Sequence, residues 1–453
     1  MPMEKGPTGK AVKLKRSFVN RLFAELPSLI ASNVISAAVA DDIRRYYETR
    51  ASGERRNTVF VVFGIVGSVL VGLGIILLIA YNWSAMTKAV KTVFAFALLA
   101  AGIGVSGFAY FTRRDSAAWR ESAGTLLFLI IGAVLALIGQ IYHLPSDTGA
   151  FMLTWVLLAV PVVYMLDASA PAVLYIAGIT GWAGIAQSEG GHALLFWPLA
   201  AVIAWHFIRH FRENPFSVRS AFIAWSYALA ACVSIGVSLE KVIPGLWIII
   251  YSSYFAVLFL IGGIWLSEAP TIWQRPFYII GSVGVSLLSL VFTFKECWHN
   301  VGIGFYRSGG KFHPVAAITD YILVAGLTLL AVYLFIVSIR KRKDIAVILF
   351  GLFPVIAAGC YLLAMYRLPF HPAWVFNLYA CAIGVAAIIS GIRGMRQGIV
   401  NGGMLIIAVL IFMRFIDMDL SILARAIVFL VIGCAFLAAN AILAKVFKRS
   451  APQ

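Results

Sequence analysis

The chain has 453 residues, of which 62% are hydrophobic and only 12% are charged. A soluble domain carries about a quarter charged residues, so this composition excludes an ordinary water-soluble globular protein and favours one whose main solvent is lipid. The net charge of +17 is compatible with nucleic-acid binding, but the basic residues stand at the ends of apolar runs. That pattern is typical of membrane orientation, and we expect no nucleic-acid partner.

Residues 1–57 form a basic, mostly polar head ahead of the first apolar run, and we recognise no signal peptide in it. Phe18–Leu29 and Asn33–Glu48 are each expected to form a short helix. The second has one apolar stripe with three- and four-residue steps, made of Ile35, Val39, Ile43 and Tyr46. This stripe can pack on the protein's own helices, lie on the membrane surface, or bind a cytosolic protein partner through residues 18–50.

Fourteen apolar runs follow the head and make up a transmembrane domain over residues 58–446, with a short tail at 447–453. Backbone groups in hydrocarbon must satisfy one another, so we predict that each run is a helix. The predicted spans are 58–81, 88–111, 122–142, 149–166, 171–187, 192–208, 218–238, 245–266, 275–294, 316–339, 344–365, 373–392, 399–415 and 421–446.

The distribution of basic residues predicts the orientation of these spans. With the N-terminus inside, 27 of the 36 lysines and arginines fall on the cytosolic side, including the run Arg340–Lys343. The excess matches the positive-inside rule. We therefore predict an all-α, polytopic bundle of about fourteen transmembrane helices in a bacterial inner membrane, with both termini cytosolic.

Polar residues gather at the span ends that this orientation places outside. They are Asn82, Gln140, Tyr142, His143, Asp147, Arg367, His371, Arg414, Asp417 and Arg425. If these ends meet, they form a pocket with both signs of charge at the outer membrane boundary. Because arginine forks bind phosphate and carboxylate through two hydrogen bonds, such a pocket suits an anionic or glycan-bearing lipid headgroup.

The alternative for the same residues is a purely structural role. Gln140 and Tyr142 can satisfy neighbouring backbone or belong to the interfacial aromatic belt. Arg414 and Asp417 stand three residues apart and can form a local ion pair.

No motif predicts a catalytic residue, a cofactor or a metal ion. His143, His299 and His313 lack the spacing of a metal site, and no Gly-x-Ser-x-Gly elbow marks a hydrolase nucleophile. Of the five cysteines, only Cys297 lies in a long loop, where a thiol can react. Seven glycines in the first two predicted spans, between Gly64 and Gly107, are expected to allow close helix packing.

Three stretches of the chain resemble a bacterial family catalogued as domain of unknown function 2157. One is the glycine-rich run Gly64–Ala80, closed by Asn82-Trp83, and another is Ala136-Leu-Ile-Gly-Gln-Ile-Tyr-His143, followed by Asp147, Trp155 and Pro161. The third is looser and consists of Phe376-Asn377, Asn401-Gly402, Met413–Asp417 and Arg425-Ala426. The clear resemblance covers roughly residues 20–180. It implies a multi-span membrane protein and no agreed activity.

Three functions are compatible with these features. The first is a transporter or flippase-like protein for an amphipathic or envelope-related molecule, because nearly all of the chain lies where lipid or solute must pass. The second is a non-catalytic membrane scaffold or sensor whose cytosolic head binds a partner. The third, which we rank last, is an enzyme that acts on a lipid-linked substrate. Membrane lipids are the expected surroundings in every case.

Overall fold

The computed structural model is helical throughout the residues that it describes. These are 16–32, 34–82, 86–145, 147–189, 193–239, 245–266, 271–299, 301, 314–341, 345–366, 369–417, 426–427, 429–430, 433–434 and 437. The α-helices are α1 Arg16–Ala31, α2 Ala37–Asn82, α3 Lys88–Thr112, α4 Ala117–Tyr142, α5 Thr148–Leu166, α6 Ser169–Ser188, α7 Phe196–Glu213, α8 Val218–Ser238, α9 Leu246–Trp265, α10 Pro276–Val291, α11 Pro314–Lys341, α12 Ile345–Met365, α13 Pro372–Arg393 and α14 Gln397–Asp417. Short 3₁₀ helices are η2 Ala193–Leu195, η3 Ile272–Gln274 and η4 Lys295–Trp298.

Every predicted span from 58–81 to 399–415 corresponds to one of the helices α2 to α14. Eleven helices in the described part of the chain are long and apolar enough to cross a membrane, and two shorter apolar stretches, Val62–Gly74 and Pro276–Val291, accompany them. The protein is therefore a multi-pass helical membrane protein. The last predicted span, 421–446, and both termini lie largely outside the described residues, so the count of fourteen and the orientation stay predictions.

The chain divides into two compact units. The first contains Met1–Ser146 and Leu157–Pro171, and the second contains Asp147–Val156 and Ala172–Gln453. Helix α5 thus contributes its beginning to the second unit and its end to the first.

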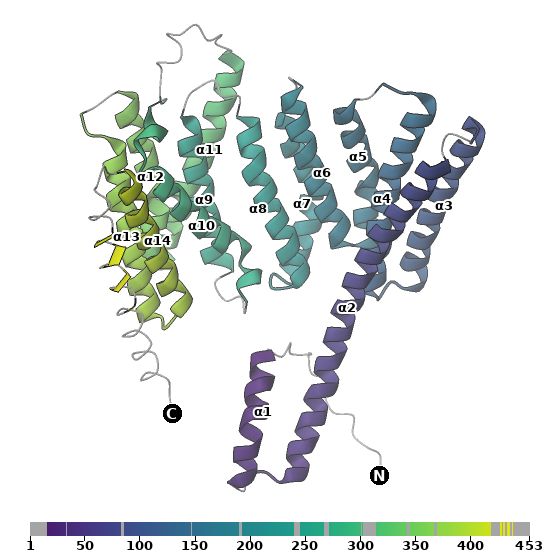
Figure 1. Cartoon of the computed structure of the whole chain (residues 1–453), viewed down its shortest axis with the longest axis horizontal. Helices are drawn as coiled ribbons and strands as arrows, with labels where there is room; N and C mark the ends of the chain where they lie inside the picture. The colour runs from purple at the N-terminus through teal and green to yellow at the C-terminus, as the bar shows by residue number, and fades with distance from the viewer. Residues whose placement is uncertain are drawn as a thin grey trace. The chain divides into compact units, whose positions relative to one another are not determined.

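The head of the first unit is a helical hairpin of α1 and the N-terminal part of α2 (Figure 1). Leu26 of α1 and Ala40 of α2 are buried, whereas Val34 and Val39 are exposed. We predicted two short helices here, but the second one does not end at the membrane: α2 runs without a break for 46 residues into the first apolar span. The polar stretch between head and span contains no proline and one glycine, so nothing in it stops a helix.

Within the first unit, α4 packs against both α2 and α3. Of the seven glycines expected to mediate close packing, Gly64 faces the Ser122 side chain and Gly102 faces Ile130 and Leu127. A Cβ added at any of the other five would meet no atom within 4 Å. Most of this glycine-rich surface therefore does not support packing among the described residues.

Two residues at the start of α4 bind the turn between α5 and α6 through hydrogen bonds and an ion pair. The carboxylate of Glu121 is buried and accepts the backbone N–H groups of Ser169 at 3.0 Å and Ala170 at 2.7 Å. Its neighbour Arg120 donates to the carboxylate of Asp167 at 3.1 Å. The first turn of a helix has N–H groups without intrahelical partners and a partial positive charge, so Glu121 satisfies two of these donors in α6.

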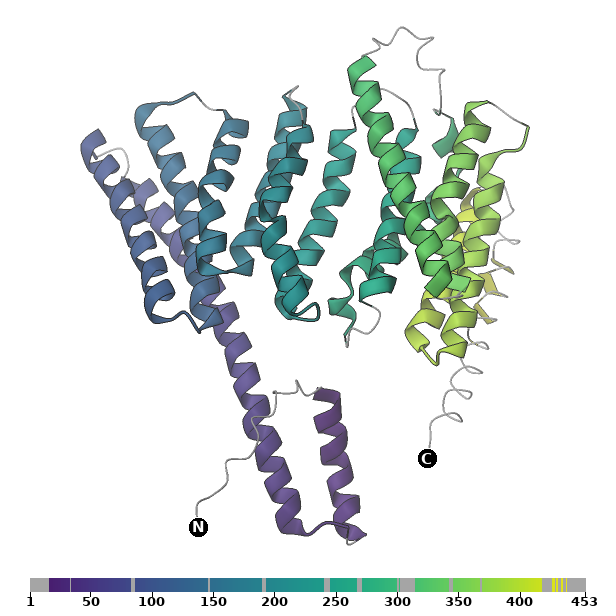
Figure 2. The same cartoon turned by 180° about the vertical axis from the view of Figure 1, so that it is seen from behind.

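Helix α9 forms the centre of the second unit, with α8, α10, α11 and α12 around it (Figures 1 and 2). Its contact with α10 is close because both helices have a glycine at the crossing. A Cβ on Gly281 would overlap the backbone nitrogen of Phe259 and lie 2.7 Å from the carbonyl oxygen of Phe255. A Cβ on Gly262 would likewise overlap the backbone of Tyr278. Here the sequence uses glycine to bring two helix backbones together, as membrane helices commonly do.

Tyrosine hydroxyls connect neighbouring helices of the second unit through main-chain carbonyls. The tyrosine-to-carbonyl pairs are Tyr175 to Leu199, Tyr227 to Ala200, Tyr251 to Cys232, Tyr254 to Ala228 and Tyr379 to Leu349. A buried hydroxyl without a partner is costly in hydrocarbon, and a carbonyl has two lone pairs, so one carbonyl can serve its own helix and a neighbour. These bonds help to fix the order α6, α7, α8, α9 within this unit.

Candidate functional site

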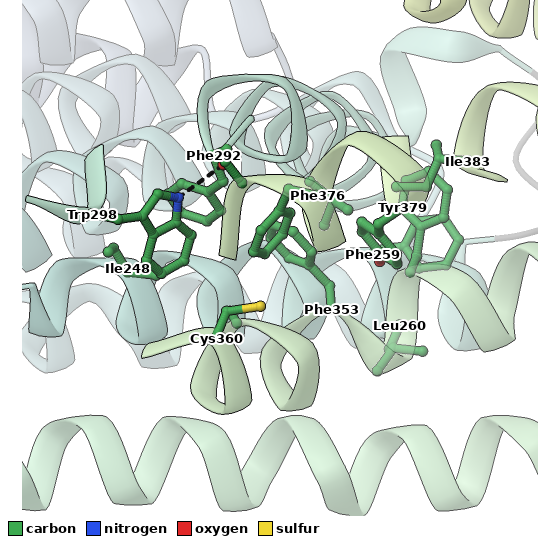
Figure 3. Packing of buried hydrophobic residues seen from close by; sticks show 14 residues of the cluster. Ile248, Phe259, Leu260, Phe292, Trp298, Phe353, Cys360, Phe376, Tyr379 and Ile383 are labelled. Carbon is green, nitrogen blue, oxygen red and sulfur yellow. Dashed lines mark hydrogen bonds between the residues drawn. The ribbon is translucent and has the colours of Figure 1, made fainter. Parts of the chain in front are cut away.

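At the end of α10 the chain turns back and covers the tip of its own helix. The backbone N–H groups of Thr293 and Phe294 bond to carbonyls in the last turn of α10, and η4 follows directly. The indole of Trp298 then points inward and donates to the carbonyl of Phe292 at 2.9 Å, as Figure 3 shows. In this turn Lys295 and Glu296 are exposed, whereas Trp298 is buried.

Arg414, in the last turn of α14, reaches this segment from a position 121 residues away in the chain. Its guanidinium donates to the hydroxyl of Thr293 at 3.0 Å, and its Cζ atom lies 5.3 Å from the centre of the Phe294 ring. Thr293 is fully buried, and its hydroxyl donates to the carbonyl of Leu290 at 2.6 Å. The hydroxyl therefore has a lone pair directed at Arg414, and the aromatic face adds a cation–π contact.

His371 caps the start of α13 and lies close enough to the same segment to feel the charges of Lys295 and His299. Its Nδ1 accepts the backbone N–H of Ala373 at 3.2 Å, so the ring caps the helix. Partial burial, followed by the positive charges of Lys295 and His299, lowers the pKa of His371, and Glu296 opposes the shift. The capping bond and the lowered pKa both favour the neutral ring with Nδ1 unprotonated. We call Thr293, Phe294, Lys295, His371 and Arg414 together the Arg414 site.

Protonation of His371 should weaken the start of α13. As the pH falls, the unfolded chain, with a histidine pKa of about 6.5, takes up the proton before the folded one. The stabilisation is therefore complete above that value and is lost as the pH falls from there through the lower pKa of the folded state. We expect the thermal midpoint of the wild type to drop more between pH 7 and 5 than that of His371→Asn, which keeps a capping side chain but cannot titrate. Parallel pH profiles for the two proteins would show that His371 is not linked to folding.

A closely packed aromatic cluster, drawn in Figure 3, adjoins the Arg414 site in the chain, since it contains Phe292 and Trp298. The ring of Phe292 lies 5.0 Å from Phe376 and 5.6 Å from Trp298, and Phe353 stacks on Tyr379 at 5.6 Å. These rings come from α12, α13, the end of α10 and η4, so the same packing that builds the core also holds Thr293 and Phe294 in place. The polar site therefore rests on a rigid apolar base.

Exposed apolar side chains occur on the same helices, near the start of α13 and the end of α14. Trp374 and Leu378 of α13 are 62% and 76% exposed, and Phe412 of α14 is 50% exposed. In a membrane these side chains face lipid. The site thus combines cationic groups with apolar surface, a chemistry that fits an anionic headgroup carrying hydrocarbon chains.

Cys297, the cysteine that the sequence places in a long loop where a thiol can react, lies in η4. Its thiol is within 3.4 Å of the carbonyl of Val291. Burial, and secondly the negative charge of Glu296, raise the pKa of this thiol. Since the thiolate is the nucleophile, the surroundings of Cys297 suppress its reactivity.

The other residues predicted for the polar pocket are found in different places. In the first unit, the Tyr142 hydroxyl and Thr92 of α3 are hydrogen-bonded at 3.1 Å, and His143 ends α4 with a left-handed backbone, φ 52°. In the second unit, the carboxylate of Asp147 caps α5 by accepting the N–H of Ala150 at 2.7 Å. These are local structural roles, and Gln140 is exposed at the end of α4.

For the remaining four residues the structure gives less. Asn82 ends α2 and Asp417 ends α14, but their side chains are outside the described part, as are Arg367 and Arg425 altogether. Of the predicted pocket residues, His371 and Arg414 are therefore the two that the structure places around one segment, η4 and the residues before it. The convergence of the full set stays a prediction.

Sequence reasoning misses two groups of residues. Thr293 and Phe294 were counted as the end of a span, and no sequence signal links them to Arg414. His206 and His210 were overlooked, although their four-residue spacing on an apolar helix is visible in the sequence and the structure buries both.

Residues 27–172 match the protein family described as Predicted membrane protein (DUF2157). The match confirms the resemblance inferred from the sequence over this part of the chain, and the looser C-terminal likeness lies outside it. Searches among curated proteins and among solved structures found no match.

Proposed function

We propose that this multi-pass membrane protein, with its DUF2157 region, binds an anionic, amphipathic envelope molecule at the Arg414 site and moves it across a bacterial inner membrane. The observation that carries the proposal is the approach of Arg414 and His371 to the segment around η4. A phosphate or carboxylate headgroup matches the planar fork of a guanidinium, and Thr293 and Phe294 hold that fork in one orientation. Lys295, the residue after Phe294, supplies a second positive charge in the same segment.

The apolar part of such a molecule finds its complement on the same helices. The aromatic core under the site is too closely packed to admit a chain, so hydrocarbon would lie along Trp374, Leu378 and Phe412 on the lipid side. Predicted orientation places this end of α13 and α14 outside the cytosol. Headgroup recognition would then occur at the outer membrane boundary.

Lipid movement in proteoliposomes tests this function. A headgroup- or chain-labelled fluorescent phosphatidylglycerol is reconstituted with the protein, and dithionite bleaching of the outer leaflet reports the rate of exchange between leaflets. We expect faster exchange than in protein-free vesicles, and slower exchange of the zwitterionic phosphatidylcholine analogue. Hydrogen bonds to charged groups contribute about 1.5–3 kcal/mol, so Arg414→Gln should reduce the rate for the anionic lipid by roughly 10- to 100-fold.

The matched control is Arg209→Gln. Arg209 is an exposed arginine of α7 that pairs with Glu213 on its own helix, and its loss should leave exchange unchanged. A wild-type protein that moves neither lipid, nor any other envelope lipid or solute offered, would contradict the transport function. Equal exchange rates for wild type and Arg414→Gln would show that the protein transports lipid without using the Arg414 site.

The continuity of α2 favours a second candidate, a sensor whose head binds a cytosolic partner. At about 1.5 Å per residue, the 46-residue helix is roughly 69 Å long and connects the head to the first span without a hinge. Deleting residues 1–50 distinguishes the two functions. If lipid exchange in vesicles is retained but a cellular phenotype of gene loss is not rescued, the head acts through a partner.

A further inference from the structure

The buried face of α7 changes character along the helix. Its buried residues follow the helical repeat and are Phe196, Ala200, Ile203, His206 and His210. The first three are apolar, as expected for a face packed within a membrane protein. The last two are imidazoles, 3% and 9% exposed, at the end of the helix that also carries Arg212.

Two imidazoles in these positions need a physical reason. Burying a polar group costs free energy unless it binds a partner, and packing alone is satisfied by any residue of similar size, so we expect the two imidazoles to interact with polar groups or with an ion. His206 and His210 also face each other: their ring centres are 4.6 Å apart, and their ring nitrogens lie within 4.8 Å. A single helix therefore presents two imidazole nitrogens to one point.

We propose that His206 and His210 bind a divalent transition-metal ion such as Zn²⁺ or Cu²⁺. Histidines four residues apart lie on one helical face, and this spacing supplies two ligands to zinc in the H-E-x-x-H helix of metalloproteases. Zinc–nitrogen distances of about 2.0–2.1 Å require the two nitrogens to be about 4 Å apart or less, which small rotations of the two rings provide. Water or further side chains complete the coordination.

The neighbouring helix holds the pair in place. The hydroxyl of Ser220 in α8 is fully buried and donates to the carbonyls of His210 and Asn214 at 3.2 and 2.9 Å. Tyr227 of α8 bonds to the carbonyl of Ala200 one turn and a half before His206. Because α8 fixes the backbone of α7 at both ends of this stretch, the two imidazoles start near the geometry that a metal requires.

The site is independent of the Arg414 site and of any lipid transport. Two ligands on successive turns would hold the last turns of α7 together. We expect a bound ion to raise the thermal midpoint of the protein. A metal here would make stability, and not lipid specificity, depend on metal supply.

Copper titration of the full-length protein tests the site. The protein is purified in detergent without a polyhistidine tag, stripped with chelator, and titrated with Cu²⁺ under electron paramagnetic resonance. We expect one high-affinity ion whose hyperfine pattern shows two coordinated imidazole nitrogens. His206→Ala and His210→Ala should each weaken binding by at least about tenfold and leave a single-imidazole signal, whereas His143→Ala, at an exposed position of the first unit, should change nothing.

The number of imidazole nitrogens bound to Cu²⁺ is measured on the wild type, so this part of the test does not depend on whether the variants fold. A wild-type spectrum with fewer than two imidazole nitrogens would overturn the proposal. So would an affinity that both α7 substitutions leave unchanged, because the ion would then lie at another histidine.

Discussion

Glu121→Ala is expected to lower the thermal midpoint of the purified protein by roughly 5–10 °C. The substitution removes both acceptors of the Ser169 and Ala170 N–H groups at the start of α6, of which the first is buried and the second partly buried. Each unsatisfied buried donor costs about 1–3 kcal/mol, and the favourable interaction of a carboxylate with the helix N-terminus is lost as well. A change of this size moves the midpoint of a domain of 150–250 residues by about 2–4 °C per kcal/mol.

Two further variants make the interpretation specific. Glu121→Gln keeps one oxygen acceptor and should fall between the wild type and Glu121→Ala. Glu213→Ala removes an acid that is 58% exposed and paired with Arg209, and exposed pairs contribute little, so its midpoint should stay close to that of the wild type. If Glu121→Ala unfolds at the wild-type temperature, the contact with α6 does not stabilise the first unit.

Gly281→Ala is expected to destabilise the second unit by about 3 kcal/mol or more. The added methyl would overlap the backbone nitrogen of Phe259 and approach the carbonyl of Phe255, and backbone atoms in a helix cannot rotate away as a side chain can. Helices α9 and α10 would have to separate, and inserting even one methyl into a packed core costs about 1–3 kcal/mol where side chains can adjust. Thermal unfolding in detergent, with yield of folded protein as a second readout, measures the effect.

Adjacent glycines of α9 provide the control for this argument. Gly262→Ala meets the backbone of Tyr278 and should be as damaging as Gly281→Ala, whereas Gly263→Ala meets no atom within 4 Å. Alanine is favoured over glycine in a helix by about 0.5–1 kcal/mol, so Gly263→Ala should be neutral or slightly stabilising. Equal midpoints for Gly262→Ala and Gly263→Ala would show that α9 and α10 do not approach each other closely.

The helices themselves could be predicted because hydropathy and length largely decide where a chain crosses a membrane. Predicted limits such as 218–238 coincide with α8, and 88–111 differs from α3 by one residue. The continuity of α2 could not be predicted in the same way. Its charged middle, residues 49–57, reads as a linker by polarity, yet nothing in it opposes helix formation.

The glycines show where sequence reasoning failed on packing. Gly67, Gly72 and Gly104 lie in a conspicuous cluster, but a Cβ added at any of them would meet no atom of the described residues within 4 Å. A Cβ added at the scattered Gly262 or Gly281 would overlap neighbouring backbone. Density of glycine along the sequence does not reveal which face of a helix is covered. That depends on which helices are neighbours, and hydropathy carries no such information.

Only part of the candidate site could be predicted, because hydropathy does not reveal which helices are neighbours. Arg414 and His371 stand out because they lie at span ends predicted to face outward, where basic residues are few. Their partner segment, Thr293 to Trp298, is recognised only once α10, α13 and α14 are packed together. Tyr142, His143 and Asp147 stand out equally in the sequence, but their contacts in the structure are explained by helix ends.

Headgroup binding to the purified protein tests the central claim most directly. Dissociation constants for a short-chain phosphatidylglycerol and for the matching phosphatidylcholine are measured in detergent, for wild type, Arg414→Gln and Arg209→Gln. We predict that the wild type and Arg209→Gln prefer the anionic lipid, and that Arg414→Gln loses this preference through affinity for phosphatidylglycerol weakened by roughly tenfold or more. If wild type and Arg414→Gln bind the two lipids alike, the Arg414 site does not recognise an anionic headgroup.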